Sequence, residues 1–252
     1  MNVIFSRDRP AQLDLLLRSL RKFNPFHQEM NTVVIYRASA GEFRQGYERL
    51  STVALMREEE DFDTDLRWAL GLDADTVTFW CDDDILIRPV PTDPARMLLD
   101  NDRLLCVRLT LGRQNRPTPN GFPVWKWQEL PPTDFGYPCG LDGLVMRVTD
   151  ANDMLQEHVA NPNIMETILA MGAERLHKTR PLAACFMNQV AVGVPVNRVS
   201  RISTIPVGQE HPQTTRQLNR MWLKGYRISL DGLDASGVRG VHHEMKFQWE
   251  RA

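Results

Sequence analysis

The sequence has few of the features that mark a specialised class of protein. A membrane-spanning helix needs an apolar run of about 18 residues or more, and the chain contains none. The first residues lack the apolar core of a signal peptide. Only four cysteines occur in 252 residues, and no C-x-x-C pair indicates a zinc site or a disulfide framework. These absences predict a protein of the reducing cytoplasm.

An excess of charge of one sign is also lacking. The chain has 30 Lys and Arg against 32 Asp and Glu, which gives a net charge of -2. No overall field therefore attracts nucleic acid or an anionic membrane. With 42% hydrophobic and 25% charged residues, the composition is that of an ordinary globular protein. Because we find no repeat and no clear boundary, we predict a single domain over residues 1–252.

The segment 1–110 alternates between strand and helix patterns. Short apolar stretches at residues 2–5, 32–36, 53–56, 76–81 and 104–109 predict strands. Helices are expected after Pro10, over residues 41–50, and after a cap at Asp63 or Thr64. This alternation predicts a Rossmann-like α/β fold with a mostly parallel sheet flanked by helices. Ligands of such sheets bind beyond the carboxyl ends of the strands.

The second half of the chain is less regular. Residues 112–138 are rich in Pro and Gly but contain several aromatic residues, which indicates a long functional loop rather than a linker. A strand is expected at residues 144–148, and helices from a cap at Thr149 to about residue 159, at 163–171 and at 214–224. The C-terminal segment 238–252 shows no periodicity.

An acidic cluster follows the strand predicted at residues 76–81. Asp82, Asp83 and Asp84 are adjacent, and their mutual repulsion is costly unless solvent or a cation compensates it. Carboxylate oxygens are the ligands that Mg²⁺ and Mn²⁺ prefer, often with substrate phosphates completing the shell. The cluster therefore suggests a metal–diphosphate site, and a solvated acidic turn is the alternative.

These segments together resemble the nucleotide-diphosphate-sugar glycosyltransferases of the GT-A fold, in particular their large family-2-like group. The resemblance rests on the strand ending in Phe-Ser-Arg-Asp-Arg-Pro, the next strand ending in Tyr36-Arg37, the acidic segment 58–65 and the Asp cluster. It covers the segment 1–110 well and the rest loosely. The cluster is similar to that family's D-x-D element. The family's Q-x-x-R-W motif is missing, so processive polymer synthesis is not expected.

The resemblance implies a donor half at residues 1–110, with Mn²⁺ or Mg²⁺ as the cofactor. Asp82 and Asp84 are the implied metal and ribose contacts, and Asp83 is an additional donor contact unless it points away. Either Glu60 or Asp61 is a candidate acceptor for a uracil N–H. The remaining candidate donor contacts follow the first two strands: Phe5, Ser6, Arg7, Arg9 and Arg37.

The same resemblance places the acceptor in residues 111–252. Asp142, between Gly140 and Gly143, is the first candidate base, and Glu166 is the second. His242, or His243 beside it, is a candidate third metal ligand. Trp125 and Trp127 alternate as if on one face of an extended segment, which suggests either a stacking platform or a core position.

The sequence therefore predicts a metal-dependent enzyme that moves one sugar from a nucleotide diphosphate, most simply UDP, to a hydroxyl of a glycan, a small molecule or modified DNA. A nucleotidyltransferase is an alternative, although the loop after the first strand has no glycine. A DNA-modifying sugar transferase acting on hydroxymethylated bases is another. The third is a non-catalytic nucleotide or nucleic-acid binding protein that uses the basic stretches 198–201 and 216–227.

Overall fold

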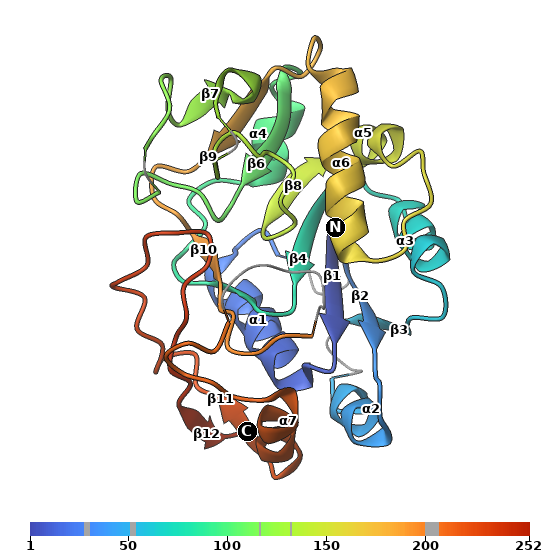
Figure 1. Cartoon of the computed structure of the whole chain (residues 1–252), viewed down its shortest axis with the longest axis vertical. Coiled ribbons are helices and arrows are strands. Elements are labelled where there is room, and N and C mark those ends of the chain that lie inside the picture. The colour runs from blue at the N-terminus through green and yellow to red at the C-terminus, as the bar shows by residue number, and fades with distance from the viewer. Residues whose placement is uncertain (28–30, 51–53, 116, 132, 200–206) are drawn as a thin grey trace.

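A mixed sheet forms the centre of the protein (Figure 1). The computed structural model describes residues 1–27, 31–50, 54–115, 117–131, 133–199 and 207–252, and within them the sheet has the order β3-β2-β1-β4-β8-β6-β9-β7. Its strands are β1 (Asn2–Arg7), β2 (Thr32–Arg37), β3 (Leu55–Glu58), β4 (Thr76–Cys81), β6 (Leu104–Arg108), β7 (Val124–Lys126), β8 (Leu144–Arg147) and β9 (Leu182–Cys185). Among these strands, only β7 and β8 are antiparallel to the rest.

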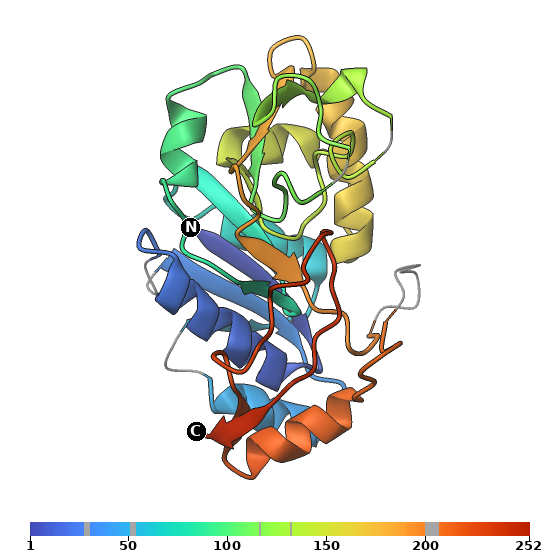
Figure 2. The same cartoon turned by 90° about the vertical axis from the view of Figure 1, so that its left-hand side faces the viewer.

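Helices cover both faces of this sheet. One face carries α1 (Pro10–Phe23), α2 (Gly41–Glu48), α4 (Pro94–Leu99) and α7 (Thr215–Leu223), and the other carries α3 (Phe62–Leu70), α5 (Val148–Met154) and α6 (Pro162–Leu176). The strands are apolar on both sides: in β1, Ile4 packs on the α1 side while Val3 and Phe5 pack on the α3 side. Figure 2 shows α1 and α6 on opposite sides of the sheet. The predicted α/β sheet flanked by helices is confirmed.

Two short strand pairs lie outside this sheet. β5 (Asp84–Leu86) pairs with β10 (Ala191–Gly193), and β11 (Tyr226–Ile228) pairs with β12 (Trp249–Arg251). β5 begins at the third residue of the acidic cluster, so Asp82 and Asp83 form the turn between β4 and β5. None of the described helices is long and apolar enough to cross a membrane.

The elements predicted within the segment 1–110 are confirmed with small shifts. The strand expected at residues 53–56 is β3, which begins at Leu55, and Val53 lies outside the described residues. The cap of α3 is Asp61, whose carboxylate accepts a hydrogen bond from the Thr64 N–H at 2.9 Å, rather than Asp63 or Thr64. In β1, β2 and β4 the β-branched and aromatic residues that suggested the strands are among the residues that pair.

The second half departs further from expectation. α5 begins at Val148 and ends at Met154, so Thr149 lies inside the helix and does not cap it. α6 extends over Pro162–Leu176, beyond the expected 163–171, and Asn161 caps its start by accepting from the Ile164 N–H at 3.1 Å. α7 matches its prediction, with Thr214 and Gln217 forming a capping box.

Of the two alternatives for Trp125 and Trp127, the core position is confirmed and the stacking platform is wrong. These side chains are 2% and 3% exposed and belong to the core on the α3 side of the sheet. The Trp125 indole N–H donates to the Phe135 carbonyl at 2.8 Å, and that of Trp127 donates to the Arg180 carbonyl at 3.0 Å. Their polar atoms are therefore satisfied inside the protein, and they stabilise the 112–138 loop.

Candidate functional site

A cavity of about 430 Å³ lies at the carboxyl ends of β1, β2 and β4. The register explains why these ends meet, because Arg7 is opposite Arg37 and Phe5 is opposite Cys81. The cavity also reaches the start of α6. Most of the predicted site residues line it, namely Phe5, Ser6, Arg7, Arg9, Arg37, Asp82, Asp83, Asp142, Glu166 and His242. Glu60 and Asp84 are not among the lining residues.

The backbone turns sharply after β1. Asp8 has φ of +57°, a left-handed conformation that Asp tolerates better than most residues. Its carboxylate holds this turn by accepting from the Ser39 N–H at 2.7 Å and from the Ser39 hydroxyl at 2.8 Å. The turn brings the next side chain, Arg9, into the interior.

Arg9 joins the acidic turn to the segment after β10. Its Nη1 lies 2.8 Å from Asp82 Oδ1 and 3.0 Å from Asp83 Oδ2. Its Nε donates to Asn197 Oδ1 at 2.7 Å, and its Nη2 donates to the Asn197 carbonyl. Burial alone would lower the pKa of Arg9, but the two carboxylates raise it. Arg9 is only 7% exposed, so it is a structural cation rather than a free phosphate contact.

Both carboxylate oxygens of Asp82 also make contacts within the protein. Its Oδ2 accepts from the Ser6 hydroxyl and from the Arg7 N–H, both at 2.9 Å, while Oδ1 faces Arg9. Burial raises the pKa of Asp82 to about 6 although the Arg9 charge lowers it. These contacts occupy both oxygens, so Asp82 does not fit the role of metal ligand that the sequence suggested.

Asp83 and Asp84 lie differently from the sequence expectation. Extended geometry would point Asp83 away, but its side chain is 20% exposed and lines the cavity. Asp84 is fully buried, with Oδ2 accepting from the Cys81 N–H at 2.8 Å. Burial, together with the Asp142 and Asp83 carboxylates, raises the pKa of Asp84 well above its ordinary value. Extended alternation fails here because the chain turns between β4 and β5.

Asp142 is paired with His242. The His242 Nε2 lies 3.0 Å from Asp142 Oδ2 at the cavity wall. Burial favours a raised pKa for Asp142, but the hydrogen bond and charge of His242 outweigh it and lower the pKa. Conversely, burial disfavours the His242 cation, yet Asp142 raises its pKa. The pair thus favours an ionised carboxylate beside a protonated imidazole.

Two glycines allow this pairing. Gly143 follows Asp142 with φ of +62°, and a β-carbon there would lie 3.0 Å from Leu109 Cβ. Gly193 in β10 bonds to the segment around His242: its N–H donates to the Val241 carbonyl at 2.9 Å, and its carbonyl accepts from the His243 N–H at 2.9 Å. A β-carbon on Gly193 would lie 2.7 Å from His242 Cδ2, so glycine is needed for this close approach.

Glu166 faces the cavity from the first turns of α6. Burial, followed by the nearby Asp142 charge, raises the pKa of Glu166 to about 7. The Arg108 charge and the interaction with the Tyr137 hydroxyl lower it in part. Asp142 and Glu166, the two candidate bases, therefore line one cavity with opposite pKa shifts.

Glu59, and not the predicted Glu60, is the residue of this acidic segment that lines the cavity. Its Oε1 lies 3.4 Å from Arg37 Nη1, and burial raises its pKa although Arg37 and Arg7 lower it. Glu60 is exposed and its N–H donates to the Asp65 carboxylate at 3.1 Å, away from the cavity lining. The acidic segment therefore reaches the cavity through Glu59, one position before the predicted residue.

Sequence reasoning also missed residues that act through tertiary contacts. Asn197 holds Arg9, and Arg108 lies buried beneath the 137–142 loop, where its Nη1 donates to the Tyr137 carbonyl at 2.9 Å. Neither follows a motif. In the basic stretches, Arg201 lies outside the described residues, while Arg216 pairs with Glu42 at 3.0 Å.

Comparisons with known proteins give structural neighbours only. No protein-family model and no curated protein matches this chain. Residues 1–349 of S. aureus TarS in complex with UDP-GlcNAc align with a TM-score of 0.49 and 12% identity, over 82% of this chain and 61% of that chain. The complex of the same TarS residues with UDP aligns with a TM-score of 0.48 and 13% identity, over 75% of this chain and 59% of that chain. The chain thus spans less than two thirds of the length of these neighbours.

Proposed function

We propose that the protein transfers one sugar from a nucleotide diphosphate donor, with UDP as the nucleotide, to an acceptor hydroxyl. The observation that carries this proposal is a single cavity with two chemically different walls. One wall is formed by the strand ends that carry Arg7, Arg37 and the acidic turn. The other carries two carboxylates, Asp142 and Glu166, from segments far along the chain.

The strand-end wall suits a nucleotide diphosphate. Phe5 and Phe62 line the cavity with ring centroids 5.3 Å apart, and they offer an apolar surface for a base. Glu59 is placed to accept a hydrogen bond from a base N–H or a ribose hydroxyl. Arg7 and Arg37 are exposed at the ends of paired strands, where guanidinium groups can bind phosphate oxygens.

The residues present also fit a divalent cation, although through Asp83 rather than Asp82. Asp83 contacts Arg9 through Oδ2 at 3.0 Å, and its partly exposed carboxylate lines the cavity. We propose that Asp83 holds Mn²⁺ or Mg²⁺. When bound, such an ion neutralises charge on the leaving diphosphate. His242 was a candidate ligand, but its Nε2 is engaged by Asp142.

Asp142 is the proposed base. It is ionised at neutral pH, and His242 fixes its orientation. An acceptor hydroxyl would give its proton to Asp142 as its oxygen bonds to the anomeric carbon. The bond from that carbon to the diphosphate oxygen breaks, and the diphosphate leaves with the electron pair. Glu166, with a pKa of about 7, can accept or donate a hydrogen bond to the acceptor and is the second candidate base.

Mass spectrometry tests this function directly. The protein is incubated with Mn²⁺, mixed nucleotide sugars and an acceptor panel that includes glycans, small alcohols and hydroxymethylated DNA. We expect one acceptor to gain the mass of one sugar, with product strongly reduced for Asp142→Asn. Asp100→Asn is the matched control, because Asp100 is an exposed carboxylate next to α4. Failure of the protein to bind or consume any nucleotide sugar would contradict the proposal.

A further inference from the structure

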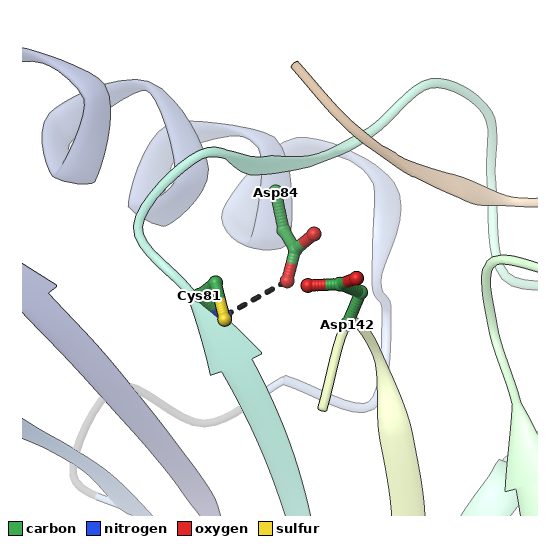
Figure 3. Close-up of side chains that lie close together, drawn as sticks. All are labelled: Cys81, Asp84 and Asp142. Carbon is green, nitrogen blue, oxygen red and sulfur yellow. Dashed lines mark hydrogen bonds between the residues drawn. The ribbon is translucent and has the colours of Figure 1, made fainter. Parts of the chain in front are cut away.

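Three potential metal ligands converge at the wall of the cavity. Cys81 ends β4, Asp84 begins β5, and Asp142 precedes β8. One ligand atom from each lies within 4.8 Å of the others. Figure 3 shows the Asp84 and Asp142 carboxylates facing each other beside Cys81. We call these three residues the thiol cluster.

An unsatisfied atom in this cluster indicates a missing partner. Asp84 has no exposure, and its Oδ1 has no hydrogen-bond partner. Gly193 lies beside this oxygen, because a β-carbon built on Gly193 would be 3.5 Å from Asp84 Oδ1 and 3.3 Å from His242 Nε2. The unpaired oxygen therefore faces the side of the cluster where His242 contacts Asp142. Buried polar atoms are nearly always paired, and the neighbouring Asp142 carboxylate can supply a partner only if one of the two carboxyl groups is protonated.

The chemistry of the donor set decides which partner fits. Mg²⁺ and Mn²⁺ prefer shells made of oxygen, whereas a cysteine thiolate selects softer ions such as Zn²⁺ and Co²⁺. One sulfur and two carboxylates are three protein ligands, the number found in zinc sites that keep an open position. Cys81 and Asp142 line the cavity, so an ion has a path to enter and that open position faces the cavity.

We propose that Cys81, Asp84 and Asp142 form a binding site for a thiophilic divalent ion such as Zn²⁺, separate from the hard ion proposed at Asp83. Binding forms a metal–sulfur bond and releases to solvent the Cys81 thiol proton, together with the Asp84 proton where that carboxyl group is neutral. The consequence rests on the proposed function: an ion here holds the carboxylate of the proposed base, so its presence inhibits transfer. The two metals would thus have opposite effects on one enzyme.

Cobalt is the probe, because a Co²⁺–thiolate bond gives a charge-transfer absorption band that oxygen ligands do not. The full-length protein, treated with chelator and then dialysed, is titrated with Co²⁺. We expect the band to saturate at one equivalent, to be displaced by Zn²⁺ and to persist in excess Mg²⁺. Cys81→Ser should abolish it and Asp84→Asn should weaken it. Cys185→Ser should keep it, since Cys185 is a buried cysteine at the end of β9, outside the thiol cluster.

Circular dichroism of each metal-free variant shows whether it is folded. Absence of the band in wild-type protein, or an undiminished band in folded Cys81→Ser, would overturn the inference. If Cys81→Ser does not fold, two other samples replace it: the Asp84→Asn variant and wild-type protein with alkylated thiols. An unchanged cobalt band in both samples would also overturn the inference. Because the readout requires no turnover, a positive band combined with no sugar transfer by cobalt-free protein in Mn²⁺ would refute the proposed function alone. Transfer without the band would refute this inference alone.

Discussion

Replacing Arg9 by methionine removes the guanidinium that Asp82 and Asp83 share. Arg9 is 7% exposed and the Asp82 side chain is 4% exposed, so the pair is shielded from solvent. Breaking a buried ion pair by removing one partner typically costs about 3–5 kcal/mol, because the remaining charge loses its compensation. The Asp83 contact is more exposed and adds less. We therefore expect Arg9→Met to lower the free energy of unfolding by about 3–5 kcal/mol at neutral pH.

The loss of unfolding free energy in Arg9→Met should also depend on pH. The pKa of Asp82 is about 6 with Arg9 present, and Arg9 is the main group that lowers it, so the pKa rises further in Arg9→Met. A carboxyl whose pKa is raised by folding binds its proton more tightly in the folded state. Its ionisation therefore removes stability as pH rises from the ordinary value of 3.8 through the folded value. The loss in Arg9→Met should be larger at pH 8 than at pH 5.

Urea unfolding followed by tryptophan fluorescence measures both effects. Wild type, Arg9→Met, Asp82→Asn and the double variant are compared at pH 5 and pH 8. The double variant should lose less stability than the sum of the single variants, because the asparagine side chain carries no charge to leave unpaired. A loss below about 1 kcal/mol for Arg9→Met at pH 8, no more than an exposed pair contributes, would refute the assignment of Arg9 as a buried structural cation.

Three further predictions concern the cavity and the loop beside it. Calorimetry should show tighter UDP binding with Mn²⁺ than with chelator, and Asp83→Asn should remove the difference; equal affinities would exclude the metal role. Asp142→Asn should lower kcat by ~10²–10⁴ with donor affinity unchanged. It should also shift the Glu166 inflexion in the pH profile downward from about 7, since the Asp142 charge raises that pKa; a near-normal kcat would assign the base to Glu166. Trp125→Ala should cost about 3–5 kcal/mol of stability, as measured by urea unfolding, with unchanged KM values at temperatures where it stays folded. A selective rise in the acceptor KM would restore Trp125 as an acceptor contact.

Much of the fold was predictable because the segment 1–110 carries strong local patterns. Apolar strands of β-branched residues and leucines at helical spacing predicted the order from β1 to β4. The strands that were missed, such as β5 and β10, have three residues each and are too short to show a period. Their pairing depends on contacts between segments far apart in the sequence.

The candidate site was predictable only where a residue follows a strand end. Arg7, Arg37 and Asp83 line the cavity because parallel strands bring their carboxyl ends to one edge. The orientation of Asp82 toward Arg9 was not predictable, because it depends on the left-handed turn at Asp8. For Trp125, alternation identified a shared face but could not tell a solvent face from a core face.

The place of β8 in the sheet bears on any attempt to divide the protein. β8 comes from the second half of the sequence, yet it lies between β4 and β6 of the first half. A fragment ending at residue 110 would expose an unpaired edge of β4 and would leave β6 with no neighbouring strand in the same sheet. Its Arg9 would also lack Asn197. Residues 1–110 are therefore not a unit that can be produced separately, and tests of the proposed UDP binding need the whole chain.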